Sequence, residues 1–82
     1  MILTAEISLY PTDKDFVPPI KSFIARLNRY DGIKVQTSPT ATIVVGDHDT
    51  VMDIIKRETK AHREEFGMGI FVTKLIPGYE AL

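Results

Sequence analysis

The chain of 82 residues contains no cysteine, which excludes a disulfide framework and thiolate chemistry. It also lacks an excess of either charge: the formal net charge of −1 gives no electrostatic reason to expect nucleic acid or an anionic membrane as partner. No apolar run approaches the ~20 residues of a membrane helix, and no charged segment followed by an apolar run suggests a signal peptide. We therefore expect a soluble, cytoplasmic protein with no nucleic-acid partner and no membrane insertion.

Signatures of the common enzyme classes are absent as well. There is no glycine-rich phosphate loop, no nucleophile elbow and no cluster of cysteine and histidine. His48 and His62 stand at opposite ends of an expected helix, about 20 Å apart along its axis, which is too far to share a metal ion within one subunit. We expect both histidines to be partly exposed, and we predict no catalytic residue, no metal site and no cofactor.

The length predicts one domain, spanning residues 1–82. A domain of this size buries only about 60–65% of its unfolded surface, so the core is modest. A modest core favours assembly of several copies, and we expect a homo-oligomer.

The most informative feature present is a strand at residues 3–10, in which apolar and polar side chains alternate strictly. Because strand side chains point alternately to the two faces of a sheet, one face of this strand can pack on a core. The other face carries a carboxylate, a hydroxyl and a phenol in one row, from Glu6, Ser8 and Tyr10. Such a row could bind a small polar, partly aromatic molecule.

A first helix is predicted to begin near Pro18-Pro19, because prolines are tolerated in a first helical turn. Asp13 or Asp15 can cap it, and Asp31-Gly32 is expected to end it. Ile20, Phe23, Ile24 and Leu27 give this helix one apolar face.

A second helix is predicted after Asp47 or Asp49, either of which can cap it, and it is expected to end at Phe66. Its charged second half, residues 56–65, is expected to project into solvent.

Further strands are predicted at residues 33–37, 41–46 and 69–76. The element order then predicts an α+β, ferredoxin-like βαββαβ fold, with an antiparallel sheet of strand order 4-1-3-2 and both helices on one face. The other face stays open to water, ligand or a partner chain. We expect Thr42 and Val44 to neighbour Glu6 and Ser8 on this open face.

Other candidates surround this row. Lys74 is expected on the open face, where it can form an ion pair with Glu6, and that pair would give Glu6 a structural role instead of a binding role. A hydroxyl-rich turn from Thr37 to Thr40 can line the rim of a pocket. The predicted ligand-binding residues are Glu6, Ser8, Tyr10, Thr37, Thr42, Phe71 and Lys74.

Residues 5–11 (Ala-Glu-Ile-Ser-Leu-Tyr-Pro) resemble the opening of the thiamine/hydroxymethylpyrimidine-binding protein family, whose first strand carries Glu-x-Ser and a following proline. Residues 37–52 resemble the same family, which has Pro-x-x-Thr in the hairpin and then Gly-acid-x-Asp-x-Val-Met. The sequence departs from the family at Thr12-Asp13, where many members have Leu-Gly, and at Thr40-Ala41, where many have Met-Gly.

The resemblance implies ferredoxin-like units that form dimers, often tetramers, through their sheets. It also implies a binding protein for thiamine or its hydroxymethylpyrimidine moiety, with a role in salvage or transport of the vitamin. Carried over residue by residue, the ligand-binding candidates are Glu6, Ser8 and Thr42, followed by Thr37. The alternative is a structural or regulatory oligomer without a thiamine ligand, and an enzyme acting on a phosphate ester ranks last.

Overall fold

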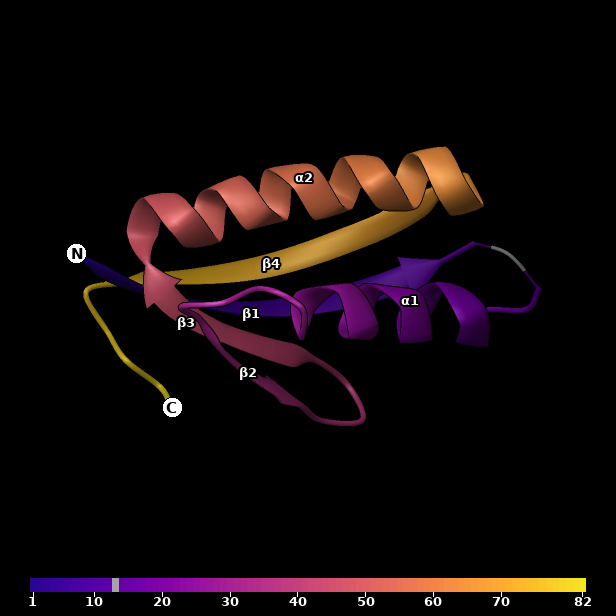
Figure 1. The fold of residues 1–82 in the computed structure, drawn as a ribbon. Helices are drawn as coiled ribbons and strands as arrows, with labels where there is room; N and C mark the ends of the chain where they lie inside the picture. Colours follow the sequence, from indigo (N-terminus) through magenta and orange to yellow (C-terminus); the bar gives the residue numbers. More distant parts are fainter. Residues whose placement is uncertain (13) are drawn as a thin grey trace.

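The fold consists of two helices and four strands, and the computed structural model describes residues 1–12 and 14–82. The elements are β1 (Ile2–Pro11), α1 (Val17–Leu27), β2 (Lys34–Thr37), β3 (Thr42–Asp47), α2 (His48–Phe66) and β4 (Gly69–Pro77) (Figure 1). The strand order is β2-β3-β1-β4, and all neighbouring strands are antiparallel. The predicted ferredoxin-like fold and strand order are therefore confirmed.

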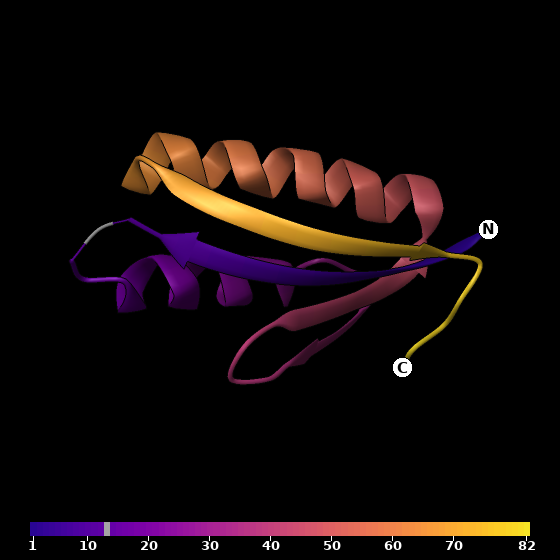
Figure 2. The ribbon, with the colours of Figure 1, turned by 180° about the vertical axis from the view of Figure 1, so that it is seen from behind.

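Both helices cover the same face of the sheet, so that in the view from behind the strands lie in front of them (Figure 2). The alternation of β1 produces this arrangement, because its odd-numbered apolar side chains all point toward the helices. The core between the layers consists of Leu3, Ala5, Ile7, Phe23, Leu27, Val44, Val51 and Ile54.

Among the described residues no side chain caps the first turn of α1, so Asp15, one of the two predicted caps, does not cap it. Phe16 occupies the cap position, and Pro18 and Pro19 stand in the first helical turn. A capping side chain accepts from the second or third helical N–H, and two prolines there leave no N–H to accept from. The alternative cap, Asp13, lies outside the described residues.

The helices begin and end near the residues predicted from the sequence, except that α1 ends earlier than predicted. α1 ends at Leu27, before the predicted Asp31-Gly32 stop, and the Asn28 side chain donates to the carbonyl of Ile24 at 2.9 Å. At the start of α2, Asp47 accepts from the N–H of Asp49 at 3.2 Å, so Asp47 is the cap.

The second half of α2 does not project wholly into solvent, contrary to the prediction. Glu58 and His62 are only 4% and 6% exposed, because they continue the buried stripe of Val51 and Ile54.

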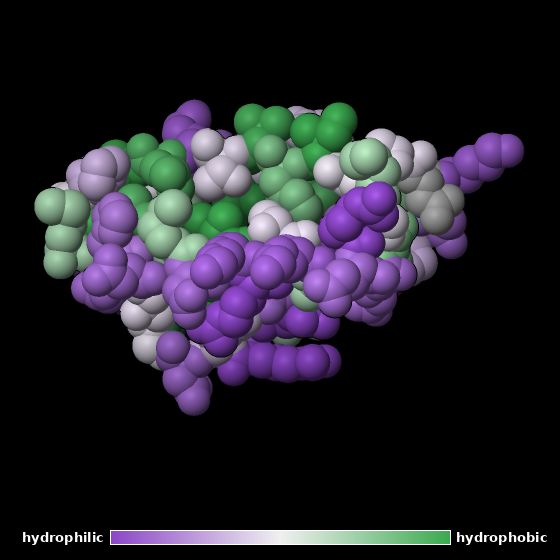
Figure 3. Space-filling model, turned by 90° about the horizontal axis from the view of Figure 1, so that it is seen from above, coloured by the Kyte–Doolittle hydropathy of each residue, from purple (hydrophilic) through white to green (hydrophobic). Residues whose placement is uncertain are grey.

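Figure 3 shows hydrophilic surface gathered on one flank of the molecule and hydrophobic surface along the other. In the described part of the chain, neither helix combines the length and the apolar character that crossing a membrane requires.

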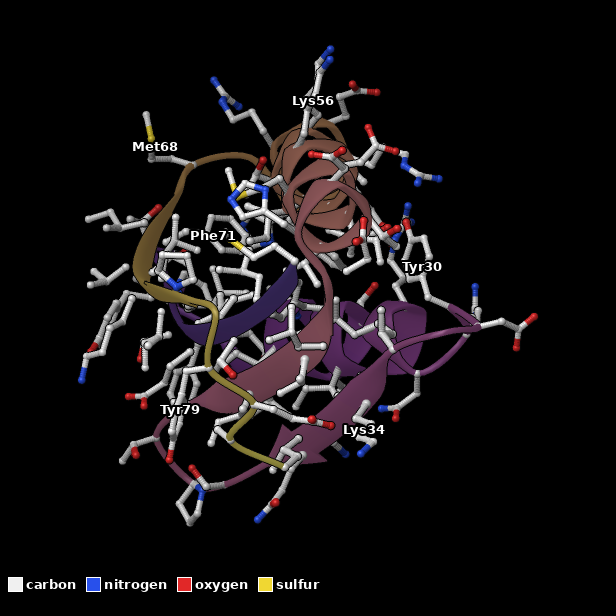
Figure 4. All side chains as sticks on the ribbon, turned by 90° about the vertical axis from the view of Figure 1, so that its left-hand side faces the viewer. Tyr30, Lys34, Lys56, Met68, Phe71 and Tyr79 are labelled. Carbon is white, nitrogen blue, oxygen red and sulfur yellow. The ribbon has the colours of Figure 1, made fainter. Side chains whose placement is uncertain are left out.

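The C-terminal segment after β4 crosses one end of the open face of the sheet. Thr4, only 2% exposed, donates to the carbonyl of Tyr79 at 2.6 Å and accepts from the N–H of Ala81 at 3.1 Å. Lys34 on β2, labelled in Figure 4, forms an ion pair with Glu80 at 3.1 Å. The segment therefore covers the sheet near Thr4 and leaves the end near Tyr10 uncovered.

Candidate functional site

The register of the sheet separates the predicted site residues onto opposite faces. Glu6 and Ser8 lie on the open face, whereas Thr42 pairs with Ile7 of the core. Because directly opposed residues of antiparallel strands share a face, Thr42 points toward the helices, as does the buried Val44. The prediction that Thr42 and Val44 neighbour Glu6 and Ser8 on the open face is wrong.

A cavity of about 70 Å³ lies on the helix side of the sheet, between α1 and the hairpin of β2 and β3. Its apolar wall comes from Ile7, Leu9, Ile20, Phe23, Ile24, Pro39 and Ala41. Its hydroxyl groups come from Thr37, Ser38, Thr40 and Thr42. Apolar walls with a few polar groups are typical of small-molecule sites, although these usually measure about 300 Å³ or more. The cavity is therefore smaller than a typical small-molecule site.

Hydrogen bonds hold the hairpin turn beside this cavity. The N–H of Ser38 donates to the carbonyl of Ala41 at 2.8 Å, and the Ser38 hydroxyl accepts from the N–H of Ala41 at 3.3 Å. From the neighbouring β1, the hydroxyl of Ser8 donates to the carbonyl of Thr40 at 3.1 Å. Ser8 thus contacts the turn that carries the cavity hydroxyls, which gives it a positioning role toward that cavity.

On the open face, Glu6 pairs with Lys74, and the predicted position of Lys74 is confirmed. The two charged groups are 4.0 Å apart, and the Glu6 side chain is 42% exposed. An exposed pair at this distance contributes at most about 1 kcal/mol. The Glu6 carboxylate therefore remains available as an acceptor for another group.

The two predicted aromatic contacts are on different faces. Tyr10 is exposed at the end of β1 on the open face. Phe71, labelled in Figure 4, pairs with Leu9 on the helix side of the sheet. Its ring packs edge-on against Phe23, with the ring centroids 5.4 Å apart. Phe71 cannot line the same site as Tyr10, but it supports the Phe23 wall of the cavity.

A buried carboxylate between the helices was missed by sequence reasoning. Glu58 accepts from the Nε of Arg26 at 2.5 Å and from the hydroxyl of Tyr30 at 2.6 Å. The hydrogen bond to Glu58 raises the pKa of Arg26, while burial and then the same carboxylate raise the pKa of Tyr30. The available signal was the position of Glu58 on the apolar stripe of α2. Both Glu58 oxygens are occupied, so this group ties α1 to α2.

No metal centre is formed by the part of the chain that the structure describes, where no three carboxylate or histidine side chains converge.

Solved structures support the fold at low sequence identity. A protein from Streptococcus pneumoniae has a TM-score of 0.88 and 20% identity over 96% of this chain and 89% of its own. A Thermotoga maritima protein described as a "putative thiamine biosynthesis/salvage protein" has a TM-score of 0.85 and 20% identity, over 99% of this chain and 86% of its own. A domain of unknown function from Bacillus cereus has a TM-score of 0.73 and 19% identity, over 93% and 75%.

No curated protein sequence matches the chain. A family model does match it, over residues 2–73. This match extends from β1 into β4 and includes the cavity, the hairpin turn and both helices. The chain belongs to the YKOF-related family.

Proposed function

We propose that this protein binds the hydroxymethylpyrimidine moiety of thiamine, free or as part of the vitamin, in the cavity between α1 and the β2–β3 hairpin. The observation that carries the proposal is a set of four hydroxyl side chains beside an apolar wall. The family and the description of the Thermotoga maritima protein favour a thiamine-related ligand. The role is binding in salvage or transport in the cytoplasm, without catalysis.

The chemistry of the cavity suits a small heteroaromatic ring. Phe23 and its apolar neighbours offer a surface for the ring, while Thr37 and Thr42 can both donate and accept hydrogen bonds. An aminopyrimidine presents donors and acceptors around its edge, and hydroxyls suit both. The turn at Thr40 borders the cavity and accepts a hydrogen bond from Ser8 at 3.1 Å.

Glu6 provides a second possible position for the same ligand. A carboxylate can accept from an exocyclic amine and from a protonated ring nitrogen together. Glu6 lies on the opposite face of the sheet from Thr42, so the two residues cannot contact one bound ring from within the same chain. Substitutions at these two positions therefore distinguish the cavity from the open face.

The Thr42→Val variant is expected to bind hydroxymethylpyrimidine about 2- to 13-fold more weakly, because one hydrogen bond contributes about 0.5–1.5 kcal/mol. Valine keeps the shape of threonine and removes only the hydroxyl. Titration calorimetry with hydroxymethylpyrimidine and thiamine measures the change, and Glu6→Gln is the matched variant on the open face, expected to bind like wild type. If Glu6→Gln loses binding and Thr42→Val keeps it, the ligand occupies the open face. If wild type binds neither compound, the proposal fails.

The open face favours a second role, as an interface between copies of this chain. Several apolar side chains stand exposed there, including Val72, 57% exposed, with Tyr10 and Ile70 beside it. We infer that the protein forms a homodimer or homotetramer through this face, because apolar residues grouped on one surface mark contact sites.

The Val72→Asp variant is expected to be monomeric, because it places a charge in that contact. Light scattering after size-exclusion chromatography gives the mass, and Met52→Asp is the control, because Met52 is an exposed apolar residue of α2. A wild-type protein that is already monomeric at high concentration would contradict the interface.

A further inference from the structure

The imidazole ring of His62 on α2 is buried at the junction of α2 with β4. It is 6% exposed, and among the residues that the structure describes neither ring nitrogen has a hydrogen-bond partner. Buried polar side chains are nearly always paired with protein or water, so an unpaired ring at this position requires an explanation.

The ring is enclosed by the junction between α2 and β4. It contacts Phe66, with ring centroids 5.7 Å apart, and it packs edge-on against Phe71 at 5.3 Å. β4 begins at Gly69, and the backbone of Gly69 lies directly against the imidazole ring of His62. The approach is so close that a Cβ at position 69 would lie 2.3 Å from the Nε2 of His62. The first residues of β4 thus pack closely against the imidazole ring of His62 and leave it one position.

Charged groups face the ring from both helices. Arg26 of α1, together with Glu58 and Glu65 of α2, lines the small hollow beside it. Glu58 is already engaged by Arg26 and Tyr30, and Glu65 is half exposed and 3.8 Å from Arg26. From β4, the residues that contact the ring carry no charge. The hollow measures about 10 Å³, enough for one water at most.

A proton on this ring would therefore create a buried charge beside a Glu58 carboxylate that is already engaged and a Glu65 carboxylate that is half exposed. Such a charge is costly unless the site opens. Burial lowers the pKa of His62, and the Glu65 carboxylate opposes that effect. We propose that His62 is an acid-sensitive latch, whose protonation loosens the junction of α2 with β4.

Phe71 connects His62 to the candidate cavity. Phe71 packs edge-on against both His62 and Phe23, and Phe23 lines the cavity between α1 and the hairpin. Loosening at His62 frees Phe71 and removes the support of the Phe23 wall. Acid therefore weakens ligand binding from a distance, a consequence that rests on the proposed function.

The direction of the pH effect follows from the two protonation states. In the unfolded chain His62 titrates near its ordinary pKa of 6.5, and in the folded protein its pKa is lower. Above that ordinary value both states are neutral and stability does not change. As the pH falls below it, the unfolded state binds more protons and stability is lost.

Urea unfolding at about pH 7.5 and about pH 5.5 tests the latch without any ligand. For wild type the unfolding equilibrium constant should rise by up to about tenfold at the lower pH, one unit below the unfolded pKa. His62→Leu should lose this rise, while His48→Gln should keep it, because His48 is the chain's other histidine and is partly exposed. A pH-independent wild type, or a His62→Leu variant that keeps the rise, would overturn the proposal.

If His62→Leu does not fold, an NMR titration of the ring protons in wild type decides the same question. The latch predicts that the ring protons of His62 titrate with a midpoint below the ordinary imidazole pKa of 6.5, and a midpoint at or above that value would overturn it.

Calorimetry with hydroxymethylpyrimidine at both pH values tests the link to the cavity. Wild type should bind more weakly at the lower pH, and His62→Leu should show a smaller loss. Equal wild-type affinity at both values would contradict the link. Failure to bind at either value would contradict the proposed function, while the unfolding data would still decide the latch.

Discussion

Replacing Glu58 with alanine should lower the free energy of unfolding by about 3 kcal/mol, because breaking a buried ionic pair leaves its partners uncompensated. Arg26 and Tyr30 both donate to this carboxylate, and the side chain is 4% exposed. The loss of the bond leaves the Tyr30 hydroxyl without an acceptor between the helices. Urea unfolding of the variant and wild type at neutral pH measures the difference.

Glu65→Gln is the control, because Glu65 faces the same Arg26 at 3.8 Å but is half exposed. Its removal should change stability by less than about 1 kcal/mol, as for other exposed pairs. If both variants cost the same, the burial of Glu58 does not matter and the carboxylate does not tie the helices together.

Replacing Ile54 with alanine should lower the free energy of unfolding by about 2–5 kcal/mol, the usual cost of truncating a buried aliphatic side chain. Ile54 is 1% exposed and belongs to the core beneath α2. Thermal and urea unfolding measure the loss. Met52→Ala on the same helix, where the side chain is exposed, should stay within about 0.5 kcal/mol of wild type. Equal losses would mean that α2 does not pack as described.

The fold was predictable because the local sequence of each helix and strand indicates its type and its position. The strict alternation of β1 defines its core face, the proline pair marks the start of α1, and Asp47 caps α2. With two amphipathic helices and four strands, the rule of right-handed crossovers leaves one arrangement that buries both apolar faces.

The site was less predictable because β3 gives no signal for its orientation. Its central residues Ile43, Val44 and Val45 are apolar on both faces, so periodicity cannot decide which side Thr42 faces. Only the register with β1 decides it, and register depends on pairing across the sheet. The cavity could not be predicted for the same reason, because its hydroxyl groups all belong to the β2–β3 hairpin, whose orientation the sequence does not indicate.

Two further features depend on tertiary contacts that local sequence patterns do not predict. Glu58 and His62 read as part of a charged, solvated helix end, yet the stripe of Val51 and Ile54 continues through them. The bond from Thr4 to Tyr79 joins residues 75 positions apart, and no motif in either segment predicts it.

The first measurement to make is an amide ¹H–¹⁵N NMR titration of the wild-type protein with hydroxymethylpyrimidine. Binding in the cavity predicts that the largest shifts occur at the amides of Thr37, Thr40 and Thr42, with smaller ones at Phe23 on α1. Largest shifts at Glu6, Val72 and Lys74, or no shifts at saturating ligand, would contradict binding in the cavity.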